Sequence, residues 1–168
     1  MGKSAEQKTD CGVVIDGTEA HGTGLLTRVA ELHRVVASLR IVGDAPDSDR
    51  ISALLGCKPT KGWARGDVIK RGKLPDRVAT FGLWSLEASE TQPADLDLQV
   101  DEIIERTSND LRRWAEVGAA FEVSLFCGWF MEAWNEGTSL APRTLEALAV
   151  RGIALDIDLY GPSDDDPE

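Results

Sequence analysis

The sequence predicts a two-layer α+β sandwich, in which three helices cover one side of a sheet of about four strands, mostly antiparallel or mixed. Two observations lead to this prediction. Segments with the two-residue period of strands alternate along the chain with segments of helical period. The last strand also has one acidic face, which must meet water, so helices are expected on the other side only. The fold is expected to be ferredoxin-like in general character.

Four segments have strand patterns. In the first, Leu39 and Ile41 lie on one face and Arg40 on the other, which is typical of a half-buried strand. In the last, Asp156 and Asp158 alternate with aliphatic residues, so the acidic face is expected to be exposed. The expected strands span residues 37–42, 80–87, 120–127 and 153–160.

Three helices are expected between these strands. The first has Asp47 as its N-cap and Gly56 as a left-handed C-terminal stop. The longest is predicted over residues 95–117, where apolar residues recur at steps of three and four. The last is expected to begin at Pro142, since proline suits the first helical position, and to end at Gly152.

A chain of 168 residues has the length of one domain, which we place at residues 29–161. Residues 1–28 have the composition of a flexible extension, although apolar residues near helical spacing at 25–36 indicate a short helix leading into the domain. Residues 162–168 are expected to form an acidic, solvated tail. The stretch 57–78 has no sustained period and is predicted to be a long loop.

The formal net charge of -11 disfavours binding to nucleic acids and to anionic membrane surfaces, and it is compatible with a protein partner. No apolar run approaches the roughly 20 residues that span a bilayer, and no secretory signal pattern is present. Three scattered cysteines favour a reducing compartment. We therefore expect a cytoplasmic protein.

A basic segment, residues 58–77, is the first candidate binding site. It holds seven basic residues against two acidic ones in an otherwise acidic chain, and its glycines allow close approach of the backbone to a ligand. The candidate ligand-binding residues are Lys61, Trp63, Arg65 and Asp67. The alternative is that these cations pair with the acidic remainder of the chain while Trp63 packs over the sheet.

A second candidate is the aromatic loop over residues 128–137, where Trp129, Phe130 and Trp134 could form a recognition patch. Its candidate partner-binding residues are Trp134, Asn135 and Glu136. The alternative is that its aromatic side chains complete the core.

No catalytic, metal or cofactor site is predicted. Cys57 and Cys127 are expected to be small buried hydrophobes, since the two histidines lie outside the core and offer neither of them a base. The spacing of histidines and thiols matches no metal site. Asp156 and Asp158 could act as paired carboxylates, but a solvated strand face is the preferred interpretation.

Six strings in the chain resemble the bacterial family called domain of unknown function 4279, over about residues 31–161. The chain departs from the family pattern at Ser48, where the family tends to have proline, and at Ala141, where it tends to have a serine cap. The resemblance implies no activity, and it places residues 1–28 outside the family domain. The strings are ELHRVVASLRIVGD, ISALLGCKPTKGWARGD, FGLWSLEAS, FEVSLFCGWF, WNEG and LDIDLYG.

The leading hypothesis is a non-enzymatic binding module for a protein partner, of a toxin-neutralising or accessory kind. A second hypothesis is a small-anion or nucleotide-binding enzyme that uses the basic segment, with Asp67 as base or orienting carboxylate. A third is a structural subunit that self-associates through the last strand or through the loop that contains Trp134.

Overall fold

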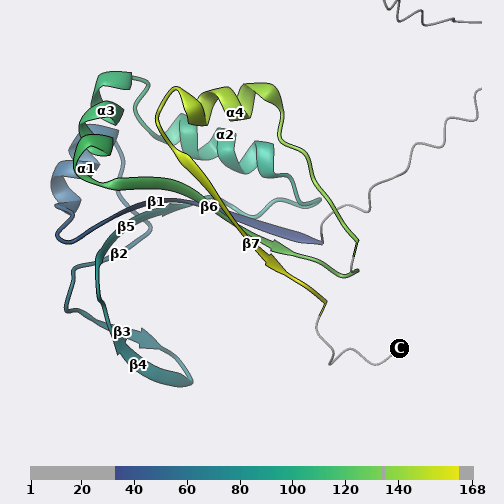
Figure 1. The fold of residues 1–168 in the computed structure, drawn as a ribbon, viewed down its shortest axis with the longest axis horizontal. Helices are drawn as coiled ribbons and strands as arrows, with labels where there is room; N and C mark the ends of the chain where they lie inside the picture. Colours follow the sequence, from purple (N-terminus) through teal and green to yellow (C-terminus); the bar gives the residue numbers. More distant parts are fainter. Residues whose placement is uncertain (1–32, 134, 163–168) are drawn as a thin grey trace, which may run out of the picture.

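The computed structural model describes residues 33–133 and 135–162 as an α+β fold built on a five-stranded mixed sheet. Its strands run in the order β2-β5-β1-β6-β7, and only β6 and β7 are parallel. Four helices lie together on one face of this sheet (Figure 1). The elements are β1 (Arg34–Gly43), α1 (Ser48–Leu55), β2 (Lys61–Trp63), β3 (Val68–Arg71), β4 (Leu74–Val78), β5 (Gly82–Glu87), α2 (Leu96–Arg106), α3 (Leu111–Ala120), β6 (Glu122–Phe130), α4 (Pro142–Ala149) and β7 (Ala154–Tyr160).

Strand β1 is the centre of the sheet. The predicted alternation is confirmed, because Leu39 and Ile41 are fully buried against the helices while Arg40 lies on the opposite face. At its beginning, β1 has no β5 partner, and a side chain of α2 replaces that strand. Ala37 N donates to Gln99 Oε1 at 2.7 Å, and Gln99 Nε2 donates to the carbonyl of Val35 at 2.9 Å. A buried amide thus satisfies backbone groups that would otherwise lack partners.

The local signals at α1 are confirmed. Asp47 accepts hydrogen bonds from the backbone N–H groups of Asp49 and Arg50, and Gly56 ends the helix with φ of 80°. Helix α4 likewise begins at Pro142, but its N-cap, Ala141, makes no side-chain hydrogen bond to the helix. The departure at Ala141 therefore leaves this helix without a side-chain cap.

The single long helix predicted over 95–117 is wrong. Helices α2 and α3 are separate, and Asp110 caps α3 by accepting from Arg112 N. The Thr107 hydroxyl donates back to the carbonyl of Ile103, and the Trp114 indole donates to the carbonyl of Ser108 at 2.7 Å. Short polar side chains at residues 107–110 compete with the helix for its backbone groups and end it here.

The long loop predicted over 57–78 is also wrong, and so are the expected numbers of strands and helices. Strand β2 extends the main sheet, and β3 and β4 form a two-stranded hairpin. The helix indicated at 25–36 is wrong from residue 34 onward, because those residues begin β1; residues 25–32 lie outside the described part. The predictions for residues 1–28 and 163–168 lie outside it as well. No helix in the described part is long and apolar enough to cross a membrane.

Candidate functional site

The candidate site lies on the face of the sheet opposite to the four described helices, here called the open face. Strand register places Arg40 opposite Ser85, and Ser85 opposite Lys61, in one row across β1, β5 and β2. The next row aligns Val42, Leu83 and Trp63. Residues from three strands that are distant in sequence therefore share one patch of the open face.

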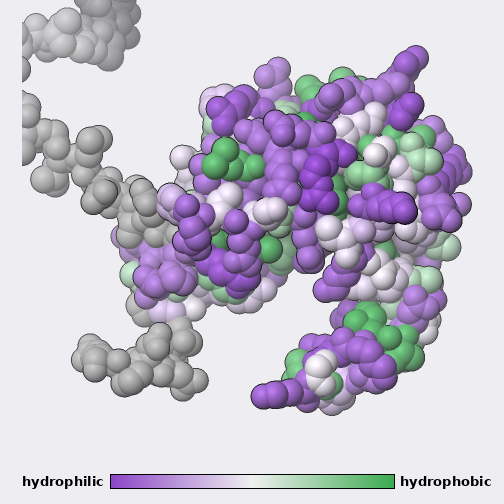
Figure 2. Space-filling view, turned by 180° about the vertical axis from the view of Figure 1, so that it is seen from behind, coloured by the Kyte–Doolittle hydropathy of each residue, from purple (hydrophilic) through white to green (hydrophobic). Residues whose placement is uncertain are grey.

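The β3–β4 hairpin borders this patch. Gly66 N donates to the carbonyl of Ala79, and Ala79 N donates to the carbonyl of Asp67, so the base of the hairpin is closed by backbone bonds. Gly66 has φ of 93°, which a side chain would oppose. The hairpin leaves the sheet as a separate arm (Figure 1). The space-filling view shows a hollow between this arm and the body (Figure 2).

A cavity of about 290 Å³, the cationic cavity, lies where β1, β2, β5 and the hairpin meet. Three of its lining side chains are basic and one is acidic, and aromatic and aliphatic side chains complete the wall. Its lining residues are Arg40, Val42, Lys61, Trp63, Arg77, Phe81, Leu83, Ser85 and Glu87.

The three cations of the cavity lack ion-pair partners. Within the described ranges, neither a salt bridge nor a side-chain hydrogen bond engages Arg40, Lys61 or Arg77. Elsewhere in the basic segment, Arg65 pairs with Asp44 at 2.7 Å and Lys70 pairs with Asp76 at 2.6 Å. In the described part of this acid-rich chain, the three cations of the cavity thus form no ion pair within 4 Å.

Arg40 is half-buried, and burial lowers the pKa of its guanidinium, an effect that Asp158 and Asp156 oppose through their charge. The group stays cationic at neutral pH because an arginine titrates far above that range. Its guanidinium carbon lies 3.5 Å from the centroid of the Phe126 ring, which positions the charge over the sheet. A partly desolvated cation of this kind gains more from an anion than an exposed one does.

Trp63 has a buried indole N–H for which the described residues supply no hydrogen-bond acceptor. Its Nε1 atom is buried, and it has no hydrogen-bond partner in the part of the chain that the structure describes. The Lys61 ammonium lies 5.8 Å from the centroid of the same indole. A buried N–H without a partner costs free energy, so a ligand acceptor that reached it would recover that cost.

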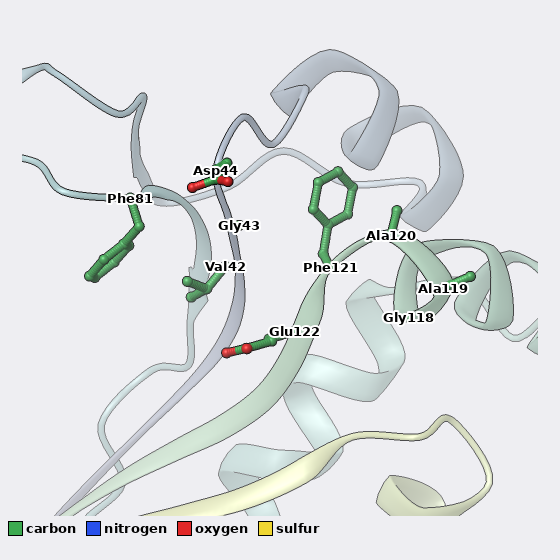
Figure 3. A pocket seen from close by; sticks show the side chains of 9 residues that line it. All are labelled: Val42, Gly43, Asp44, Phe81, Gly118, Ala119, Ala120, Phe121 and Glu122. Atoms are coloured by element: carbon green, nitrogen blue, oxygen red, sulfur yellow. The ribbon is translucent and has the colours of Figure 1, made fainter.

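A second hollow, the end hollow, adjoins the cationic cavity at the end of the sheet (Figure 3). The two share Val42 and Phe81, whose side chains lie on the same side of the strands in Figure 3. The end hollow has a volume of about 530 Å³ and contains the carboxylates of Asp44 and Glu122. A basic and an acidic subsite therefore lie next to each other.

The structure brings together only part of the predicted set. Lys61 and Trp63 line the cavity, whereas Arg65 and Asp67 do not. The carboxylate of Asp67 accepts from Ala64 N at 2.7 Å and so holds the turn before the hairpin.

The second candidate patch is not assembled at this cavity. Asn135 is exposed, and Trp134 lies outside the described residues. Glu136 accepts from the backbone N–H groups of Glu132 and Ala133, at 3.0 and 2.8 Å, which orders its own loop.

Sequence reasoning missed Arg40, Phe81 and Glu87 as site residues, and it counted Arg77 only as part of the basic segment. Arg77 reaches the cavity from β4 and Arg40 from β1, so their proximity depends on strand pairing. The outward position of an arginine on a half-buried strand was the one signal available for Arg40.

The groups considered for catalysis are two cysteines and a pair of aspartates, and their surroundings are as follows. Cys127 is fully buried, and burial raises the pKa of its thiol to about 12. Burial also raises the pKa of Cys57. Asp156 and Asp158 are exposed on β7. Among residues 33–133 and 135–162, no group of three or more His, Cys, Asp or Glu residues is placed to hold a metal ion.

The fold and site together define an α+β protein whose described helices cover one sheet face and whose other face carries a cationic cavity beside a protruding hairpin. A family model described as "Domain of unknown function (DUF4279)" matches residues 31–162, and the chain belongs to this family. The resemblance drawn from the sequence is thereby confirmed. No curated protein and no solved structure matched the chain.

Proposed function

We propose that this protein is a non-catalytic binding module that recognises an acidic segment of a protein partner, of a toxin-neutralising or accessory kind. The observation that carries the proposal is the set of three cations, Arg40, Lys61 and Arg77, which line one cavity without ion-pair partners among the described residues. Trp63 adds a buried N–H for which residues 33–133 and 135–162 supply no acceptor. A carboxylate in this cavity would pair with the cations beside the Trp63 indole.

A polypeptide is favoured over a free small molecule by the surface around the cavity. The hairpin exposes three aliphatic side chains, with Val68, Leu74 and Val78 each more than half accessible to solvent. The end hollow continues from the cavity past Phe81. An extended chain could place one acidic residue in the cavity and continue along the end hollow, or turn over the exposed aliphatic side chains of the hairpin.

An affinity capture from a lysate of the host organism tests the proposal. The bait proteins are wild type, Arg77→Ala, and Arg71→Ala as a matched control, since Arg71 is an arginine on the same hairpin that has no ion-pair partner among the described residues and does not line the cavity. We expect a stoichiometric protein to be retained by wild type and by Arg71→Ala and to be lost from Arg77→Ala. Retention of that protein by all three baits would place its contact outside the cavity.

A free small anion is the second candidate, and the size of the cavity favours it. A volume of about 290 Å³ is near the lower end for small-molecule sites. In this alternative the module would be a small-anion or nucleotide-binding enzyme. Asp67, first considered as its base, is engaged by Ala64 N, so Glu87 is the acid at hand. A thermal-shift series with inorganic phosphate, nucleoside monophosphates and glutamate distinguishes this candidate, since a stabilisation absent from Arg77→Ala would support it.

Three finer expectations stay predictions beside this proposal. They are a cytoplasmic location in a bacterium, a ferredoxin-like character of the fold, and self-association as a structural subunit. The charges on β7 bear on self-association through that strand.

A further inference from the structure

Within the described part of the chain, no strand pairs with the outer edge of β7. Strand β7 pairs with β6 in unbroken register, from Ser124 opposite Ala154 to Phe130 opposite Tyr160. Met131 N donates to the carbonyl of Tyr160, so the backbone of Tyr160 faces β6. Because backbone groups alternate along a strand, the N–H and C=O groups of Leu155, Ile157 and Leu159 point away from the sheet.

This edge lacks most features that prevent strands from pairing. In its seven residues, β7 has no proline, glycine, lysine or bulge. Ile157 and Leu159 are 41% and 62% exposed, so apolar area is available beside the free backbone groups. No other described strand lies along this edge. An extended segment could therefore add to the sheet here by strand addition.

The acidic face of β7 restricts what can be added. Asp156 and Asp158 lie exposed on the open face. In a symmetric antiparallel pair of two copies centred on Ile157, Asp156 of one copy would oppose Asp158 of the other. If the pair were centred on either aspartate, that aspartate would oppose its own copy. Opposed like charges destabilise a strand pair, so the pattern disfavours self-association.

The same charges favour a basic strand. Phe126 is the register partner of Asp156, and Arg40 lies over the Phe126 ring. A cation, an aromatic ring and an acid thus already lie side by side across the open face. A lysine or arginine opposite Asp156 or Asp158 would continue this pattern beyond the edge.

We propose that the free edge of β7 binds an extended segment of another protein that carries lysine or arginine at every second position, with aliphatic residues between them. The basic side chains would lie on the open face against Asp156 and Asp158, and the aliphatic ones would lie beside Ile157 and Leu159. This site is separate from the cationic cavity, so its test is independent of the proposed function.

The test uses labelled peptides as long as β7, with alternating lysine and valine or alternating glutamate and valine, and the full chain as receptor in fluorescence anisotropy. We expect the lysine peptide to bind wild type and the glutamate peptide not to bind. The double variant Asp156→Lys/Asp158→Lys should lose about tenfold or more in affinity for the lysine peptide and gain binding of the glutamate peptide. Because an unfolded variant would present no strand edge, this gain of binding also shows that the double variant is folded. Equal affinity of wild type and variant for the lysine peptide would overturn the proposal.

Backbone methylation separates strand pairing from simple charge attraction. Two further lysine-valine peptides carry N-methyl groups, one on its valines and the other on its lysines. In an extended peptide the N–H groups of successive residues point to opposite sides, so either those of the valines or those of the lysines face β7. One of the two methylated peptides should therefore lose binding while the other keeps it. Unchanged binding of both methylated peptides would overturn the proposal, as would sedimentation data showing a dimer of wild type that the double lysine variant abolishes.

Discussion

The guanidinium of Arg40 lies directly over the ring of Phe126, with its central carbon 3.5 Å from the ring centroid. This contact joins β1 to β6 on the open face and keeps the arginine beside the cationic cavity. An arginine that is half-buried, stacked on an aromatic ring and free of an acid partner in the described part of the chain is poised to bind an anion.

Replacing Arg40 by methionine should separate its charge from its packing. The Arg40→Met side chain can still cover Phe126, so the free energy of unfolding in urea should change by less than about 1 kcal/mol. Binding of a hexaglutamate peptide, measured by calorimetry, should weaken by about 1.5–3 kcal/mol, because a charge-assisted contact is lost. Unchanged affinity would remove Arg40 from the site. The variant Arg40→Lys, which keeps the charge, is expected to retain part of the binding.

Gln99 should be essential to the stability of the fold. The variant Gln99→Met keeps the size of the side chain but leaves Ala37 N–H and the Val35 carbonyl without partners at a buried position. We expect a loss of about 2–4 kcal/mol in the free energy of unfolding. The control is Leu98→Met, an exposed neighbour on α2, which should change it by less than about 0.5 kcal/mol. A fully stable Gln99→Met protein would contradict this role.

A capping side chain at the start of helix α4 should stabilise the protein. Ala141 has the extended backbone of an N-cap, with φ of -64° and ψ of 147°, but no side-chain acceptor. Ala141→Ser should therefore add about 0.5–1 kcal/mol to the free energy of unfolding, measured by urea titration. Ala149→Ser, at the other end of the helix, has no free N–H groups to accept from and should give no gain. Equal effects at the two positions would argue against capping.

Cys127 should be chemically inert in the folded protein. Its pKa is raised from the ordinary 9.0 to about 12, so near pH 8 its thiolate fraction is about a thousandfold smaller than that of an ordinary cysteine. Timed alkylation followed by peptide mass mapping should show Cys57 modified well before Cys127. Rapid modification of native Cys127 would show that the strand opens easily.

The same shift sets the sign of a pH effect. Below pH 9.0 the Cys127 thiol is neutral in both folded and unfolded chains and contributes no pH dependence. Between 9.0 and about 12 the unfolded chain loses this proton first, so the free energy of unfolding should fall as pH rises. The fall should be smaller in Cys127→Ala than in wild type when both are unfolded in urea over this range.

Local signals in the sequence predicted local structure correctly. The cap at Asp47 and the stop at Gly56 depend on neighbouring residues alone, and both are confirmed. Across residues 107–110, however, the helical period led to the wrong prediction of one continuous helix. Thr107 and Trp114 are both buried, so the apolar stripe continues through a break that hydrogen bonding imposes. Strands β3 and β4 were missed because almost every residue in them is exposed, which leaves no buried face for a period to reveal.

The candidate site was predictable only in part for a similar reason. Composition alone pointed to Lys61 and Trp63, since they lie in the basic segment. Arg40 is distant in sequence, and only the register that aligns Lys61, Ser85 and Arg40 brings it to the cavity. Strand register follows from the pairing of whole strand faces, which the period of each segment taken alone does not reveal.

The indole N–H of Trp63 offers the most direct measurement of the central claim. Its signal in a proton–nitrogen NMR spectrum can be assigned by its absence from Trp63→Phe, and it can then be followed as a hexaglutamate peptide is added. We expect a saturable shift in wild type and in Arg71→Ala that is lost in Arg77→Ala, because a carboxylate held in the cavity changes the surroundings of the indole that lines it. The same shift with free glutamate or phosphate alone would indicate the small-anion alternative, and an indole signal that stays unmoved by every anion would contradict a binding function for the cavity.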